Sequence, residues 1–251
     1  MKIPLTKYGW PQVVIFPVSI LILIIIVIAL CVVKILHPGI ALFLIIVLGS
    51  LLVFALAFFR DPHRNSPDDI NLLLSPADGK ITEIETTEDN DYFDGPVLKI
   101  GIFLSIFNVH INRAPCNVQI GEITYRKGKY KNALNPESSR VNESNELQMV
   151  RSDYPQAKLI VKQISGAIAR RIVCQTSNGK KLKAGQRFGM IKFGSRTELY
   201  TAVEDMRSHE IKSINDSDNI VTNNEYKVKC LVKIGDKVKA GLTPLARYEK
   251  C

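Results

Sequence analysis

The sequence has little from which to build a metal centre, a disulfide framework or a nucleic-acid interface. Its four histidines are scattered, and its cysteines are odd in number and form no C-x-x-C pair. Such cysteines are typical of reduced thiols rather than of a zinc site. The lysines are dispersed and no recognition motif is present, so we expect neither a metal nor a nucleic-acid partner. The five cysteines are Cys31, Cys116, Cys174, Cys230 and Cys251.

Charge is almost absent from the N-terminal quarter of the chain. Between residues 13 and 36, nineteen residues are Val, Ile, Leu or Phe, and residues 40–59 carry no charge. Each run reaches the roughly 20 apolar residues that a membrane span needs. A charged residue at mid-bilayer costs about 2.5–3.5 kcal/mol of insertion free energy, whereas each apolar residue contributes about 0.3–0.6 kcal/mol in favour. The many apolar residues of each run therefore outweigh one charge. Only "HPG" separates the runs, so we expect a transmembrane hairpin with helices at about 13–36 and 40–59.

The basic residues near this hairpin are unevenly placed. Two lysines and two arginines lie at its open end, whereas only Lys34 lies near its turn. Because basic segments stay in the cytoplasm, the open end is predicted to be cytoplasmic. We therefore expect residues 1–59 to anchor the chain in the cell's inner membrane and residues 60–251 to form a cytoplasmic domain. The first 59 residues hold no acids, and the remaining domain is still net basic, which suits an anionic lipid surface.

Short β-rich runs dominate after residue 70, and turn signals such as Asp94-Gly95 and Asn178-Gly179 separate them. This spacing is typical of a compact β barrel or sandwich with little helix. The polar stretches "EDNDYFDG" and "NPESSRVNESNE" are predicted to be loops. The β-rich runs are "GKITEIETT", "PVLKIGIFLSI", "GEITYRKGKY", "AKLIVKQISG", "RRIVCQT", "GMIKFGS" and "YKVKCLVKI".

Two segments repeat one another, "GKKLKAG" at 179–185 and "GDKVKAG" at 235–241. Each predicts a short strand bracketed by tight glycine turns. The pair resembles the paired elements of the barrel-sandwich hybrid of biotinyl and lipoyl carriers, although no Met-Lys-Met attachment turn is present. We expect a mainly β (α+β) fold, in which the helical hairpin precedes a β-rich, barrel-sandwich-hybrid-like domain.

Three short stretches could carry chemistry. "SPADGK" contains Asp78, whose ordinary interpretation is a hairpin turn. "FLSIFNVHINRAP" contains His110, and a single histidine at the end of an aliphatic strand is usually a packed core residue. In "RFGMIKFGSRTELY" the Gly194-Ser195 pair interrupts β-rich sequence, where glycine indicates a bulge or a close backbone approach. Together, Asp, His and Ser are the parts of a base-activated nucleophile, although Ser195 is not in a G-x-S-x-G elbow.

The blocks "SPADGKI", "IFLSIFNVHINRAPCN", "IARRIVC" and "GQRFGMIKFGSR" resemble the signature blocks of the phosphatidylserine decarboxylase family, in its short, membrane-anchored prokaryotic form. The resemblance extends from "FFRDPHR" at residue 58 nearly to the C-terminus, and the Gly-Ser block is its most specific part.

The resemblance implies that the chain cleaves itself between Gly194 and Ser195. The Ser195 hydroxyl would attack the preceding carbonyl to form an ester, and elimination and hydrolysis would leave a covalent pyruvoyl group on Ser195's former position. Asp78 would orient His110, and His110 would take the hydroxyl proton and later help to reprotonate the product carbon. The two fragments would stay together as a heterodimer, and the pyruvoyl carbonyl would act as an electron sink, as pyridoxal phosphate does.

The implied activity is decarboxylation of the membrane phospholipid phosphatidylserine, or an ether-linked analogue, to the ethanolamine lipid. Arg113 and Lys192 are phosphate candidates, although the ordinary interpretation of both is a solvated surface charge. Two other functions stay open from the residues themselves. A membrane-anchored serine hydrolase would keep Ser195 as a free hydroxyl in an intact chain, and a non-catalytic membrane-tethered adaptor would use the glycines only as bends.

Overall fold

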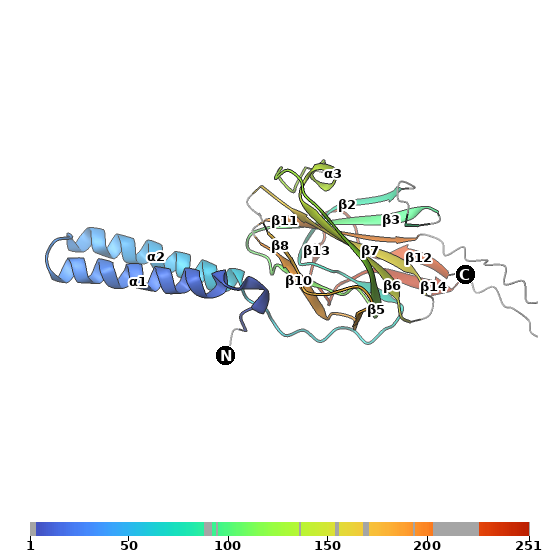
Figure 1. Ribbon diagram of the computed structural model, residues 1–251, viewed down its shortest axis with the longest axis horizontal. Coiled ribbons are helices and arrows are strands. Elements are labelled where there is room, and N and C mark those ends of the chain that lie inside the picture. The colour runs from blue at the N-terminus through green and yellow to red at the C-terminus, as the bar shows by residue number, and fades with distance from the viewer. Residues whose placement is uncertain are drawn as a thin grey trace, which may run out of the picture.

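A helical hairpin projects from one end of a β-rich domain (Figure 1). The computed structural model describes residues 4–87, 92–93, 95–135, 137–153, 156–167, 171–192, 194–202 and 226–250. Phe193, Cys251 and parts of the predicted loop "EDNDYFDG" lie outside the described residues. The predicted fold class, mainly β with an N-terminal helical hairpin, is confirmed.

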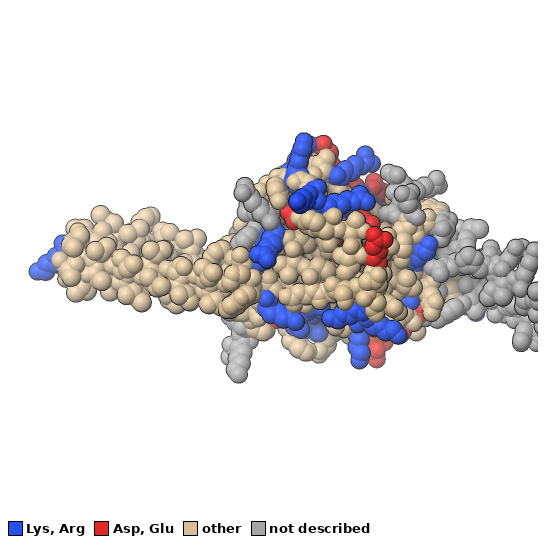
Figure 2. All heavy atoms as spheres, in the orientation of Figure 1, with Lys and Arg blue, Asp and Glu red and all other residues tan. Residues whose placement is uncertain are grey.

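The hairpin consists of α1 (Gln12–Val32) and α2 (Pro38–Phe58), preceded by a short 3-10 helix, η1 (Lys7–Gly9). The first helix ends earlier than the apolar run does, because the chain turns at Lys34, whose φ is 60°. Both helices are long and apolar enough to cross a membrane, and little of either is buried in the protein. Figure 2 shows no charged side chains along the hairpin except at its far tip, so its exposed surface suits lipid rather than water.

The strands form one large sheet and two small ones. The large sheet has the order β13-β2-β3-β11-β7-β6-β5-β9, and the small sheets have the orders β1-β14-β12 and β4-β10-β8. Every pairing within them is antiparallel. The strands are β1 (Leu72–Leu74), β2 (Gly79–Thr87), β3 (Val97–Leu104), β4 (Ile111–Arg113), β5 (Val118–Arg126), β6 (Ser144–Arg151), β7 (Lys158–Ser165), β8 (Ile172–Cys174), β9 (Lys181–Leu182), β10 (Arg187–Ile191), β11 (Ser195–Ala202), β12 (Tyr226–Cys230), β13 (Lys237–Val238) and β14 (Pro244–Lys250).

The two sequence repeats form the two edges of the large sheet. Their central strands are β9 and β13, which stand at opposite ends of the strand order. All four bracketing glycines have positive φ, between 69° and 102°, as the predicted tight turns require. A Cβ placed on Gly241 would lie 3.0 Å from the Gly185 Cα, so the two edges approach each other. The sheet is therefore curled, with its two ends brought together at the repeats.

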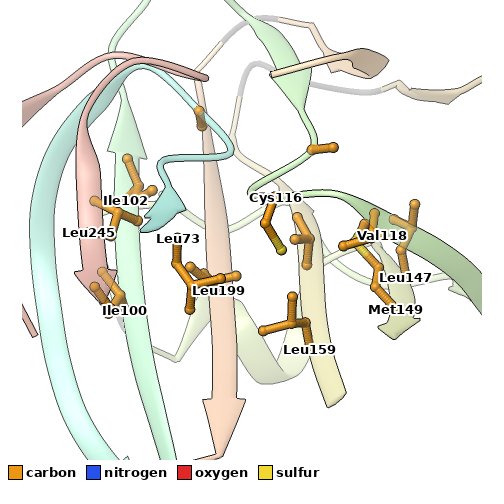
Figure 3. Close-up of a cluster of buried hydrophobic side chains, with 14 of the residues drawn as sticks. Leu73, Ile100, Ile102, Cys116, Val118, Leu147, Met149, Leu159, Leu199 and Leu245 are labelled. Atoms are coloured by element: carbon orange, nitrogen blue, oxygen red, sulfur yellow. The ribbon is translucent and has the colours of Figure 1, made fainter. Parts of the chain in front are cut away.

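The inside of the curled sheet is the main hydrophobic core. Its side chains come from alternate positions of the large sheet and from β1 and β14, as Figure 3 shows for Ile100, Leu199 and Leu245. One polar stretch was wrongly predicted as a loop. The segment "NPESSRVNESNE" contains a short helix, α3 (Ser138–Val141), and the first residues of β6. These first residues of β6 are polar, and the alternation of buried and less buried residues becomes regular only later in the strand.

Candidate functional site

Ser195 begins the central strand of the large sheet. It pairs with Leu104 of β3 on one side and with Ser165 of β7 on the other. Its side chain is completely buried, and its Oγ has no hydrogen-bond partner among the described residues. A buried hydroxyl without a partner is costly and uncommon. This arrangement suits a hydroxyl reserved for a reaction within the chain, and it does not suit a serine hydrolase, whose nucleophile must be reached by a substrate.

The peptide unit before Ser195 is held in an unusual conformation. Gly194 has a φ of 62°, in the left-handed region that glycine adopts without steric cost. Its carbonyl oxygen lies against the backbone of Gly166, which follows β7. A Cβ on Gly166 would come closer than 3.0 Å to this oxygen, nearer than real Cβ atoms approach. Gly166 thus provides the space for the carbonyl that Ser195 would attack, although its sequence context did not distinguish it.

His110 lies directly before β4 and is completely buried. Its Nδ1 is 2.9 Å from the Asn108 carbonyl oxygen, which can only accept a hydrogen bond. Burial lowers the pKa of His110 to about 4, so the ring is neutral near pH 7 and carries its single proton on Nδ1. Its Nε2 has no partner among the described residues. This nitrogen is therefore a free base, as the first step of self-cleavage needs.

The turn that carries His110 lies beside the Gly194-Ser195 bond. It follows β3, whose last residue, Leu104, pairs with Ser195. Ile106 of the turn is the nearest neighbour of a Cβ placed on Gly194, at 3.9 Å. On the other side, the backbone N–H of Ile191 donates to the His110 carbonyl oxygen at 3.3 Å. The structure thus brings the His110 and Gly194-Ser195 blocks together.

Asp78 is buried in the β1–β2 connection but makes a different contact from the predicted one. Its carboxylate forms a two-point ion pair with Arg64, with Nη2 to Oδ2 at 2.8 Å, and accepts a hydrogen bond from the Ala240 backbone N–H at 2.8 Å. No hydrogen bond joins Asp78 to His110 in the described part of the chain. The Asn108 carbonyl instead sets the tautomer, and Asp78 acts on His110 through its charge, which raises the histidine's pKa and so opposes the effect of burial.

Arg196, the residue after Ser195, belongs to a buried ionic network on the outer side of the sheet. Its Nε donates to Glu198 at 2.7 Å, and Nη2 pairs with Glu83 of β2. Glu198 also accepts hydrogen bonds from Tyr200 at 2.6 Å and from Ser139 of α3 at 2.8 Å. Burial raises the pKa of Glu198, but the charges of Arg196 and Lys99 and the hydrogen bonds from Tyr200 and Arg196 together outweigh burial, so the net pKa is lowered. The network fixes the start of β11 to its neighbours.

The sequence context of Arg113 and Lys192 suggested solvated surface charges. That interpretation is wrong, because each residue is only 3% exposed. Arg113 contacts Asp61, at 3.2 Å, and shares this carboxylate with Arg187, at 2.7 Å. The Lys192 Nζ donates to the Gln12 side chain at the start of α1, at 2.8 Å, and in the described part of the chain no carboxylate pairs with it. Burial lowers its pKa. Of the two cations, Lys192 is the one close to Ser195 in the sequence, and it is the one that no carboxylate among the described residues contacts.

The buried serine, the neutral histidine and the apolar hairpin define the class: a β-rich protein with a candidate reaction centre inside its own chain and two helices apolar enough to anchor it in a membrane. The comparisons with known proteins agree with this class. A family model described as phosphatidylserine decarboxylase matches residues 51–246. The chain belongs to the phosphatidylserine decarboxylase family, whose members are carboxy-lyases, as its sequence blocks predicted.

Curated relatives cover most of the chain. A phosphatidylserine decarboxylase proenzyme of Desulfotalea psychrophila is 39% identical over 194 residues, 77% of this chain and 79% of the relative. That of Carboxydothermus hydrogenoformans is 38% identical over 199 residues, 79% and 82% of the two chains. That of Wolbachia pipientis wMel is 41% identical over 174 residues, 66% and 74% of the two chains. All three are named as proenzymes, that is, as precursors.

Proposed function

We propose that this chain is a precursor that cleaves itself between Gly194 and Ser195 and then decarboxylates phosphatidylserine, or an ether-linked analogue with the same headgroup, to the ethanolamine lipid. The observation that carries the proposal is a pair of buried, complementary groups, neither of which has a hydrogen-bond partner among the described residues. The Ser195 hydroxyl can donate a proton, and the His110 Nε2 can accept one. Neither is exposed to solvent or to a substrate in the uncleaved chain.

The first step transfers the Ser195 hydroxyl proton to His110 while Oγ attacks the Gly194 carbonyl carbon. The new C–O bond replaces the C–N bond between the two residues, and the Ser195 nitrogen receives the proton. His110 becomes positively charged on the way, and the nearby negative charge of Asp78 favours that form. Exchanging an amide for an ester is uphill, so the attack depends on the elimination that follows it, and not on strain at Gly194, whose positive φ is free of steric cost.

Elimination across the Ser195 Cα–Cβ bond then releases the Gly194 carboxylate, and hydrolysis with loss of ammonia leaves a pyruvoyl group at the start of the 195–251 fragment. When formed, this group supplies the electron sink that decarboxylation of an amino acid needs. The fully buried Ser195 side chain fits such a group, because none of the described residues hydrogen-bonds to its Oγ. The 1–194 and 195–251 fragments stay together, since β11 remains paired with β3 and β7 and β14 with β1.

The remaining roles concern the lipid. Lys192 is the cation we assign to the headgroup phosphate, because no carboxylate among the described residues contacts it, whereas Arg113 contacts Asp61. His110 is the group we assign to reprotonation of the product carbon. The hairpin anchors the domain at the inner membrane on its cytoplasmic side, which the basic residues at its open end support.

Intact mass measurement of the purified protein tests the self-cleavage. We expect fragments 1–194 and 195–251, with the smaller one blocked to N-terminal sequencing, whereas Ser195→Ala should remain a single chain and His110→Ala should mature slowly. A wild-type protein of full-length mass with unmodified Ser195 would contradict the proposal. Release of labelled CO₂ from carboxyl-labelled phosphatidylserine in detergent micelles, without added pyridoxal phosphate or metal, tests the reaction. Cleaved protein that releases no CO₂ from diacyl or ether lipid would reject the substrate alone.

A further inference from the structure

The end of the membrane hairpin is built into the candidate site. Phe58, the last residue of α2, is 1% exposed, and its ring lies against the His110 ring with 4.4 Å between centroids and 36° between planes. Phe58 belongs to a separate small hydrophobic cluster between the hairpin and the domain. The other buried members of this cluster are Tyr8, Val13, Phe59, Val109, Ile111 and Met190.

The next residues clamp the turn that carries His110. Arg60 donates from Nη1 to the Ala57 carbonyl oxygen at the end of α2, at 2.6 Å, and from Nη2 to the Phe107 carbonyl oxygen, at 2.8 Å. One guanidinium therefore ties the last turn of the membrane helix to the turn between β3 and β4. The Phe107 ring packs edge-on against Phe54 of α2, with 6.2 Å between centroids.

The same segment reaches the other blocks of the site. Asp61 accepts from Arg113 at 3.2 Å and from Arg187 of β10 at 2.7 Å. Arg64 holds Asp78 in the two-point ion pair. Residues 58–64, which we name the anchor base, thus contact the Asp78 block, the His110 block and the strand that leads to Ser195. A flexible tether would need none of these contacts.

We propose that the anchor base is a working part of the self-cleavage machinery, in which Phe58 and Arg60 are positioning residues for His110, so that the precursor cleaves itself only when the hairpin is seated against the domain. Maturation is then tied to membrane insertion. This inference rests on the proposed function, since it concerns the same self-cleavage step. It adds that the lipid-embedded part of the chain controls when the reactive group forms.

The physical basis is the exclusion of water from His110. The charged groups that act on the ring are Arg60 at the end of α2, which lowers its pKa, and Asp78 in the β1–β2 connection, which raises it, while burial is the largest influence. Phe58 covers one face of the ring, so unseating the hairpin admits water and returns the pKa toward its ordinary value near 6.5. It also frees the turn that fixes where Nε2 lies, and a small displacement of a reacting group slows a reaction strongly.

The first test uses full-length precursor made by cell-free synthesis in lipid nanodiscs, with cleavage followed by gel and mass spectrometry between pH 4 and 8. Phe58→Ala should cleave at least about 10-fold more slowly than the wild type at pH 6, and the acidic limb of its pH profile should move from near pH 4 toward pH 6 to 7. Phe43→Ala is the matched control. Phe43 is in the same helix and 65% exposed, so its loss should change neither rate nor profile.

The pH profile separates positioning from simple destabilisation, because a loosened fold alone would slow cleavage without moving the limb. Phe58→Leu, which keeps most of the apolar cover, should show a profile between those of wild type and Phe58→Ala, and it replaces Phe58→Ala should the latter not fold. A Phe58 variant with the wild-type rate and profile would overturn the inference.

The second test compares wild-type synthesis with and without nanodiscs. We expect cleavage with lipid and at least about 10-fold less without it, because the hairpin then cannot seat against the domain. Equal cleavage in both would also overturn the inference, whereas absence of cleavage in nanodiscs would reject the proposed function itself. Ser195→Ala precursor, which cannot cleave, is the negative control for both conditions.

Discussion

Gly166→Ala is the sharpest test of where the attacked carbonyl lies. A Cβ at this position would come closer than 3.0 Å to the Gly194 oxygen, a backbone atom that cannot rotate away. The chain must therefore move by about 1 Å at a reacting group, which costs about 100-fold in rate. The overpacking itself should destabilise the precursor by about 1–3 kcal/mol. We expect a large loss of cleavage rate with a modest loss of stability.

The assay measures the half-time of precursor cleavage and, separately, thermal unfolding in detergent in a Ser195→Ala background. Gly121→Ala is the control, since a Cβ there would lie 3.4 Å from the Gln148 carbonyl oxygen, on β5, which β7 and β6 separate from β11 in the same large sheet. It should lower stability slightly and leave the cleavage rate unchanged. If Gly166→Ala cleaves at the wild-type rate although its stability falls as expected, the Gly194 carbonyl does not react from the observed position.

Three further predictions concern ionisable side chains that are buried in the domain. Lys192→Gln should raise the KM for phosphatidylserine about tenfold, the cost of one lost charge-assisted hydrogen bond, while precursor cleavage stays normal. The control, Lys183→Gln at an exposed position, should leave the KM unchanged. A Lys192→Gln enzyme with the wild-type KM would contradict the phosphate assignment. Arg196→Met should lower the free energy of unfolding by about 3–5 kcal/mol, because it removes the nearest cation from the buried Glu198 carboxylate and leaves only Lys99, at 4.0 Å. The pKa of His110 is near 6.5 in the unfolded chain but about 4 in the folded chain. The folded state is therefore about 3 kcal/mol more stable above pH 6.5, and this stability is lost as the pH falls toward 4. A His110→Gln precursor should lose this pH dependence of the free energy of unfolding.

Sequence reasoning found the parts of this molecule whose signal is local. The hairpin follows from unbroken apolar runs, and the repeats from paired glycines, which have the positive φ values that tight turns need. Four cysteines are free in the structure, as the absence of a pairing pattern predicted, and Cys251 lies outside the described residues. The residues themselves made Asp78, His110 and Ser195 candidates, the resemblance added their roles, and those roles remain predictions.

The contacts that organise the site could not be predicted because they join distant segments or involve the backbone. The tautomer of His110 depends on the Asn108 carbonyl, which has no side-chain signature. Gly166 matters only because β7 pairs with β11 in one register. Phe58 reads as one more apolar residue of a membrane helix, since nothing in the run distinguishes a lipid contact from a contact with an imidazole ring. Arg64 was visible only as a charge beside the membrane.

The position of the candidate cleavage bond explains how a chain can break inside its core without unfolding. Ile191 ends β10 in the small sheet beside the hairpin, and Ser195 begins β11 in the large sheet, so the bond lies where the chain crosses between sheets. Cleavage there breaks no strand pairing, because β11 keeps both neighbours and β10 keeps β4 and β8. The freedom gained is confined to the new chain ends beside the His110 turn. If the chain cleaves as we propose, a site that is closed in the precursor would thus loosen beside the membrane hairpin, where we expect a lipid headgroup to enter.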